Sequence, residues 1–205
     1  MIGPKEKRER ALGVSLQLKG LRSGSPKSAV IRKPYRPGAH GKTGRRKALS
    51  DFGRQLQEKQ KFKLTYGLDE RGLRRLFEVA ARAKGSNAVR LLELLESRLD
   101  NVVFRLGFAP SRSTCRQMVT QGHIFVNKKR VRSPGYHLAV NDVVSIRPES
   151  LAKAPFKELR EVLEKRNLPS WLALDPAKLE GRMVATPTDV EMPFEINLLV
   201  ESFSK

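Results

Sequence analysis

Residues 98–122 read RLDNVVFRLGFAPSRSTCRQMVTQG, and this stretch decides the fold of the second half of the chain. Asp100 stands where it can cap a short helix over 101–106, and Ser111 can cap a second helix that ends at Gly122. Short polar side chains are favoured at helix starts and glycine is favoured just past helix ends. The stretch therefore predicts two short helices in immediate succession.

The second predicted helix has an apolar stripe with cations beside it. Cys115, Met118 and Val119 form the stripe. Arg112 and Arg116 lie four residues apart on one side of it, so their side chains project in the same direction. We expect this helix to pack on a core and to offer a pair of guanidinium groups to solvent.

The residues that follow change from helix to strand. Residues 123–126 and 143–147 have the pattern of strands, and 127–130 (NKKR) that of a basic turn. Two helices followed by short strands define a small α+β module. Its cations lie at a helix start and at a hairpin tip, where phosphates can reach them.

The residues before 98 show the spacing of amphipathic helices. Apolar residues recur every three or four positions, as in helices that pack together. Phe52 and Leu56 are expected on the apolar face of the first helix, and Glu93 and Glu96 on a solvated face of the third. The predicted helices cover 50–65, 69–85 and 86–99.

The last quarter of the chain has a mixed pattern. Residues 153–167 are typical of a helix, 168–193 of short strands and loops, and 196–203 of a terminal helix. The net charge of residues 151–205 is −1. This near-neutral segment, rich in apolar residues, is expected to pack on the body of the protein rather than to bind a polyanion.

Positive charge is concentrated in two segments. The chain carries a net charge of +20, of which +12 lies in residues 1–50 and +6 in residues 101–150. So basic a surface repels itself unless a polyanion neutralises it, which points to a nucleic acid or an anionic membrane as the partner. The first 49 residues are rich in Gly and Pro, so we expect this arm to become ordered only where phosphates hold it. A mitochondrial transit peptide is the alternative, against which Glu6 and Glu9 argue.

Composition excludes several classes of protein. Apolar runs of about four residues fall far short of the roughly 20 that a membrane helix needs. The first twenty residues lack the apolar block of a secretory signal. The single cysteine, Cys115, excludes an intramolecular disulfide and a multi-cysteine zinc site. A reducing, cytoplasmic compartment is the expectation.

No catalytic constellation emerges from the sequence. Residues 38–43 (GAHGKT) partly match a phosphate-binding loop, but their spacing is two residues short and Arg36 stands where a glycine is needed. Cys115 lies on an apolar stripe, where cysteine behaves as a small hydrophobic residue. The three histidines, at 40, 123 and 137, share no ligand spacing. We expect no enzyme, no cofactor and no metal.

Two stretches resemble known families. Residues 98–109, with 122–127 (GHIFVN) and 134–136 (PGY), resemble the S-four RNA-binding domain. Residues 33–41 (KPYRPGAHG) and 50–67 (SDFGRQLQEKQKFKLTYG) are similar to the N-terminal half of the bacterial small-subunit ribosomal protein S-four family. Its C-terminal end is matched by 169–172 (PSWL) and 196–205.

The resemblance implies an α+β fold, with a mainly helical N-terminal domain and a small S-four-type RNA-binding domain of two helices and a short β-sheet. It implies a structural protein that binds 16S rRNA in its 5′ domain, nucleates subunit assembly and contributes to translational accuracy. Neighbouring small-subunit proteins, and messenger RNA where it enters the subunit, are the other implied partners; no membrane is implied. A free-standing RNA chaperone or translational repressor with the same domain is the alternative. The expected parts are a basic arm over 1–49, a helical domain over 50–97 onto which 196–205 packs, and the RNA-binding domain with its C-terminal extension over 98–195.

Two departures from the family pattern affect the expectations. Many members carry an N-terminal zinc-binding cysteine cluster, but residues 1–50 hold no cysteine, so no zinc is expected. The hairpin often has Asn-Gly, whereas this chain has Asn127-Lys128, and a lysine at positive φ costs about 1 kcal/mol. A turn of a different type is therefore one expectation.

We expect two cationic faces to bind RNA by its shape, each side chain neutralising a phosphate. The arm and the first helix supply one face, and the smaller domain supplies the other. The candidate RNA-binding residues are Arg36, His40, Arg45, Arg46, Lys47, Arg54, Lys59, Lys61, Lys63, Arg112, Arg116, Lys128, Lys129, Arg130 and Arg132.

Overall fold

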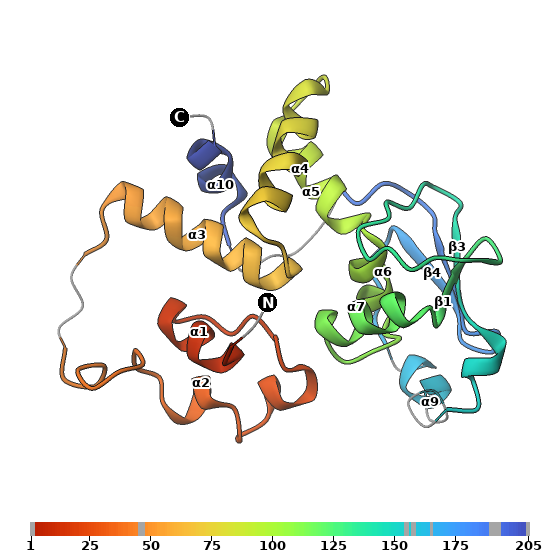
Figure 1. Ribbon diagram of the computed structural model, residues 1–205, viewed down its shortest axis with the longest axis horizontal. Coiled ribbons are helices and arrows are strands. Elements are labelled where there is room, and N and C mark those ends of the chain that lie inside the picture. The colour runs from red at the N-terminus through yellow and green to blue at the C-terminus, as the bar shows by residue number, and fades with distance from the viewer. Residues whose placement is uncertain are drawn as a thin grey trace. The chain divides into compact units, whose positions relative to one another are not determined.

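The computed structural model describes residues 3–44, 48–153, 156, 159–164, 166–188 and 194–203. The chain forms two compact units, one from residues 1–88 with 191–205 and the other from residues 89–190 (Figure 1). These units are defined by packing. The functional division into 1–49, 50–97 and 98–195 stays a prediction.

The first unit is helical. Ser50 caps its longest helix, because the Ser50 Oγ accepts a hydrogen bond from the Gly53 amide at 3.2 Å. Asp69 caps the next in the same way, accepting from the Gly72 amide at 2.7 Å. Both helix starts confirm the sequence prediction. The elements are α1 (Lys5–Leu12), the 3₁₀ helix η1 (Gly20–Gly24), α2 (Ala29–Arg32), α3 (Asp51–Tyr66), α4 (Glu70–Arg82) and α10 (Ile196–Phe203).

The terminal helix α10 packs along α3 (Figure 1). The Phe62 ring of α3 meets that of Phe194 at 4.3 Å between centroids. Polar side chains join the same contact, since Gln55 Nε2 donates to Glu201 Oε2 at 3.1 Å. The face of α3 that carries Gln55 and Phe62 is therefore the buried one.

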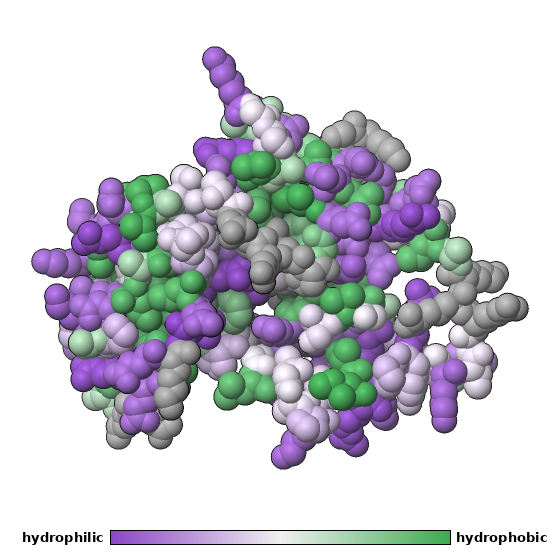
Figure 2. Space-filling model, turned by 180° about the vertical axis from the view of Figure 1, so that it is seen from behind, coloured by the Kyte–Doolittle hydropathy of each residue, from purple (hydrophilic) through white to green (hydrophobic). Residues whose placement is uncertain are grey.

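The predicted apolar face of α3 is wrong in part. Phe52 and Leu56 are 71% and 44% exposed, because the first half of the helix turns this side to solvent. The other exposed large apolar side chains include Leu21, Ile31 and Val79. On the face seen in Figure 2, apolar areas (green) lie between hydrophilic ones (purple).

The basic arm contains more regular structure than its composition predicts. Glu9 of α1 is 1% exposed, and its Oε1 accepts hydrogen bonds from the backbone amides of Leu16 at 2.8 Å and Leu18 at 3.2 Å. Leu16 is buried in turn. The expectation of an arm without a fold of its own is therefore wrong for α1, η1 and α2, because one buried carboxylate organises a loop that apolar burial alone would not hold.

The second unit packs helices on one antiparallel sheet, in the order β2-β1-β3-β5-β4. It confirms the predicted α+β fold, the Ser111 cap of α7 and the left-handed Gly122 that ends it. The helix predicted over 153–167 is too long: α9 spans Leu159–Glu164, and Lys153, Arg166 and Asn167 are not helical. The elements are α5 (Asn87–Glu96), α6 (Leu99–Leu106), α7 (Arg112–Gln121), β1 (Ile124–Val126), β2 (Lys129–Arg130), β3 (Val143–Ile146), the 3₁₀ helix η2 (Pro148–Ser150), α9 (Leu159–Glu164), β4 (Leu172–Asp175) and β5 (Glu180–Met183).

One face of this sheet is the core of the unit. Alternate residues of β1 and β3, such as Ile124 and Val144, are buried with the apolar sides of α6 and α7, which lie beside the sheet in Figure 1. Strand β5 approaches α6 so closely that a Cβ at Gly181 would collide with the Leu106 side chain. Trp171 is buried in the same core, as expected of the C-terminal segment.

Candidate nucleic-acid interface

The start of α7 holds Arg112 in a fixed orientation. The Arg112 Nε donates to Asn101 Oδ1 at 2.7 Å, and its guanidinium lies 4.4 Å from the centroid of the Phe104 ring. Both partners belong to α6. The stacked ring and the amide together place one planar cation on the surface of the helix pair.

Asp100 positions the second arginine of the pair. The carboxylate accepts from Arg98 Nε at 3.1 Å and Nη2 at 2.8 Å, and Arg116 Nη1 lies 3.4 Å from its Oδ2. Asp100 is buried, whereas the Arg116 side chain is about half exposed (48%). The prediction that Asp100 caps α6 is wrong: the helix begins at Leu99 and the carboxylate binds two arginines instead.

Glu96 anchors this polar network from α5. It is fully buried, and it accepts from Arg105 Nε at 2.8 Å and Nη2 at 3.0 Å and from Asn101 Nδ2 at 2.8 Å. Because the Asn101 amide donates to Glu96, its carbonyl oxygen is oriented to accept from Arg112. The expected solvated face for Glu96 is therefore wrong, because the carboxylate is paired inside the unit.

The hairpin has the two-residue turn with positive φ values, although a lysine is unfavourable in that conformation. Asn127 and Lys128 have φ values of 49° and 64°, both left-handed, as in the two-residue turn that favours Asn-Gly. Asn127 compensates, since its Oδ1 accepts from the Val143 amide at 2.9 Å and its Nδ2 donates to Asp142 Oδ1 at 2.8 Å. The predicted change of turn type is wrong, and Lys128 occupies the tip.

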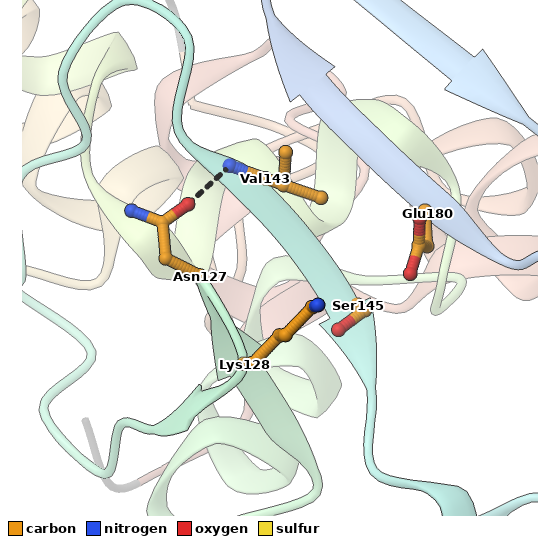
Figure 3. A pocket seen from close by; sticks show the side chains of 5 residues that line it. All are labelled: Asn127, Lys128, Val143, Ser145 and Glu180. Carbon is orange, nitrogen blue, oxygen red and sulfur yellow. Dashed lines mark hydrogen bonds between the residues drawn. The ribbon is translucent and has the colours of Figure 1, made fainter.

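Four predicted cations surround this tip. Lys128, Lys129, Arg130 and Arg132 are all exposed. Figure 3 shows the Lys128 side chain reaching toward Ser145 across a pocket of about 320 Å³, with Glu180 on the neighbouring strand. The Glu180 carboxylate makes this pocket unsuitable for a phosphate.

The arm residues have simpler placements. Arg36 and His40 are exposed, in a tight loop where a Cβ at Gly41 would collide with the Arg36 carbonyl group. Arg54 is exposed and lies 3.7 Å from Asp51. The remaining predicted cations of the arm, Arg45, Arg46 and Lys47, lie outside the described residues.

Three predicted lysines of α3 are engaged within the protein. Lys61 is buried and paired with Glu58 at 2.5 Å, so it is not offered to an external polyanion, which corrects the sequence-based expectation. Lys59 and Lys63 both bind the Glu70 carboxylate, at 2.5 and 2.8 Å. These two ammonium groups, mainly through their hydrogen bonds, lower the pKa of Glu70 although its partial burial raises it.

Sequence reasoning missed the residues that position the arginines. These residues are Asn101 and Phe104 of α6 and Glu96 of α5, and no regular spacing in the sequence links them to the two arginines of α7. Arg147 and Lys153 were also missed; each stands alone in the sequence, and only the fold brings them near Arg130 and His123. For Arg147 the one signal was the excess of positive charge in 101–150, whereas Lys153 lies in the near-neutral segment and had none.

Reactive side chains do not gather at this interface. Burial raises the pKa of the Cys115 thiol to about 12, which removes it as a nucleophile at neutral pH. Among the described residues, no three His, Cys, Asp or Glu side chains form a group that could hold a metal ion. Within the same part of the chain, no helix is long and apolar enough to cross a membrane.

Comparison with known proteins agrees with this geometry. Residues 1–96 match the Ribosomal protein S4/S9 N-terminal domain family and residues 97–144 match the S4 domain family. The fold and its cationic helix pair thus define an S4-domain protein. The chain is 46% identical to the small ribosomal subunit protein uS4 of Caldicellulosiruptor saccharolyticus, over 100% of this chain and 98% of the relative. It is 45% identical to the proteins of the same name from Roseiflexus castenholzii and Chloroflexus aurantiacus, with the same coverage.

The chain belongs to the uS4 family of small-subunit ribosomal proteins. This is a family of structural, rRNA-binding proteins of the ribosome and not of enzymes. Ribosomal RNA and other ribosomal proteins are accordingly its partners. The comparisons lend no support to a free-standing chaperone or repressor.

Proposed function

We propose that this protein binds 16S rRNA in the 5′ domain, nucleates assembly of the small subunit and contributes to translational accuracy. The observation that carries the proposal is the fixed pair Arg112 and Arg116. A guanidinium already held by a ring, an amide and a carboxylate loses little conformational entropy when it meets a phosphate.

The hairpin belongs to the same unit as this arginine pair, and the arm with α3 supplies the second face of the proposed interface. Lys128, Lys129, Arg130 and Arg132 of the hairpin and Arg36, His40 and Arg54 of the arm and α3 are exposed, whereas Lys61 is excluded by its burial. Phosphates met by two separate faces select an RNA by its shape, which suits a junction of helices. Messenger RNA where it enters the subunit is a further partner, and the ribosome of the cytoplasm is the location.

The N-terminal arm performs its part without a zinc ion. Its first 50 residues contain no cysteine. The buried Glu9 carboxylate holds the loop at Leu16 and Leu18, and Glu6 pairs with Arg22 at 3.1 Å. These contacts can maintain the conformation that a metal cluster would otherwise enforce.

The test is RNA binding by a double variant, Arg112→Gln with Arg116→Gln. Each lost phosphate contact lowers the slope of log affinity against log salt by about 0.7–0.9, so the pair should lower it by about 1.4–1.8. The measurement is filter binding to a 5′-domain fragment of 16S rRNA against excess unrelated structured RNA.

The matched control is Arg160→Gln with Lys178→Gln. It removes the same charge from exposed positions of the near-neutral C-terminal segment. The control should bind like the unmodified protein, and circular dichroism should show both variants folded. Equal losses in the two variants, or loss traced to unfolding, would contradict the assignment of Arg112 and Arg116.

A further inference from the structure

A second group of cations gathers at the far end of α7. His123 comes directly after Gly122, the residue that ends α7, and Arg147 comes directly after β3. The Arg147 amide donates to the His123 carbonyl oxygen at 2.8 Å, which joins the two segments. Arg130 of β2 reaches the same place, where its Nη2 donates to the Gln121 carbonyl oxygen at 3.1 Å. Three elements therefore bring basic side chains to one site.

The imidazole of His123 is held at the centre of this group. Its Nδ1 lies 2.9 Å from the Ser150 Oγ, and its ring meets the Phe156 ring edge-on at 6.0 Å between centroids. Partial burial lowers the pKa of His123, and the charges of Lys153, Arg130 and Arg147 lower it further. Lys153 is joined to the same segment, because its amide donates to the carbonyl oxygen of Ser150, the residue that contacts the imidazole, at 3.0 Å.

The cations of this group also repel one another. Some desolvation, and then the charges of Arg132 and Arg147, lower the pKa of Arg130. Glu149 partly neutralises this charge through an ion pair with Arg147 at 2.5 Å, and its side chain is largely exposed (67%). One exposed carboxylate against four cations leaves a strong local excess of positive charge.

Helix stabilisation accounts for only part of the arrangement. Cations at the C-terminal end of a helix interact favourably with its dipole, and the bond from Arg130 to Gln121 has that effect. Arg147 and Lys153 make no such contact with α7 among the bonds of the described residues. Since like charges repel when they are crowded together, an external anion would relieve the repulsion.

We propose that His123, Arg147 and Lys153, together with Arg130 of the hairpin, form a further phosphate-binding site for the RNA backbone, at the opposite end of α7 from Arg112. This inference rests on the proposed rRNA binding. Ten residues of helix separate the two ends by about 15 Å. One RNA can therefore contact both ends, and the guanidinium groups match the geometry of its phosphate oxygens.

The test is the double variant Arg147→Gln with Lys153→Gln in the full-length protein, bound to the 5′-domain rRNA fragment. Neither side chain contributes to the polar network of α5 and α6. Losing two phosphate contacts should reduce the salt slope by about 1.4–1.8. Raising the salt fourfold, from about 50 to 200 mM, should then weaken binding by a factor about 7–12 smaller than for the unmodified protein. The Arg160→Gln, Lys178→Gln variant is again the control.

A second measurement follows His123 itself. Long-range ¹H–¹⁵N spectra of the imidazole give its pKa with and without RNA, and a phosphate at this site should raise that pKa. The ionisable and charged groups around the ring are Lys153, Arg130 and Arg147, with Glu149 behind Arg147.

The outcomes separate this inference from the proposed function. If the unmodified protein does not bind the rRNA fragment above competitor, both fail. If it binds, but the Arg147 and Lys153 variant matches the control and the His123 pKa does not move, the phosphate site alone is refuted. The cations would then bind an acidic protein surface or only stabilise the C-terminal end of α7.

Discussion

Replacing Glu96 by Gln tests whether the buried network holds the RNA-binding face. The carboxylate is fully buried and accepts from two nitrogens of Arg105 and from Asn101. Removing one partner of a buried ion pair costs about 3–5 kcal/mol. The Arg105 side chain is 24% exposed and can recover part of its hydration. We therefore expect a loss of about 2–3 kcal/mol in the free energy of unfolding.

Trp171 makes this loss measurable in the right part of the chain. It is the single tryptophan, and it is buried in the core of the second unit. With an m value of about 2 kcal/mol/M, the urea midpoint of its fluorescence should fall by about 1–1.5 M. Arg112 should lose its fixed partner as well, because Asn101 is oriented by Glu96. RNA affinity should therefore fall even where the variant is fully folded.

Glu93→Gln is the matched control on the same helix. Glu93 pairs with Arg90 at 2.7 Å; the Glu93 side chain is 18% exposed, less than its predicted place on a solvated face implies, but its partner is 46% exposed. A pair of that kind contributes about 0–1 kcal/mol. A urea midpoint for Glu96→Gln within the error of the Glu93→Gln value would refute the reasoning, since it would mean that the network carries no more energy than a surface pair.

Three further perturbations follow from individual contacts. Burial, and then the charge of Arg98, lower the pKa of His137 below 6.5. The unfolded chain therefore binds more protons, so stability should fall as pH drops from about 6.5 toward that lowered pKa, and His137→Gln should reduce the fall in urea midpoint between about pH 7.5 and 5.5, with His123 accounting for part of what remains. Gly181→Ala would push a methyl group into Leu106, and overpacking of that kind should cost about 1–3 kcal/mol in the same urea assay. Glu9→Ala would leave one buried and one partly buried amide without their acceptor, at about 1–3 kcal/mol, and limited trypsin digestion should cut the arm faster, with unchanged cleavage arguing against an organising role.

Local sequence rules predicted the elements well. Ser50, Asp69 and Ser111 each cap the helix that they were expected to cap, and Gly122 ends α7 in the left-handed conformation. These signals act within one turn of chain, so the sequence contains the whole interaction. The apolar stripe of α7 was equally readable, because its period alone decides which side is buried.

Polar residues were harder to place because their partners are distant. Glu96 and Lys61 were assigned to solvent and to RNA, and each is buried beside an opposite charge. Asp100 looks like a helix cap, yet it binds arginines before and after it in the chain. Composition identifies a charge but not its partner, and a charge can be buried only where the tertiary fold supplies that partner.

The same fact explains how the interface is preorganised. A flexible arginine on a helix surface would lose rotamer freedom on meeting a phosphate, at about 0.5–1.5 kcal/mol for each side chain. Arg112 is already held by Asn101 and Phe104, and Arg116 is restrained more weakly by Asp100 at 3.4 Å. The carboxylates beneath them carry the opposite charge but are buried, so the guanidinium groups are what an approaching RNA meets. Buried anions beneath surface cations thus offset the repulsion within this basic face, and they leave its guanidinium groups in place for the proposed contact with RNA.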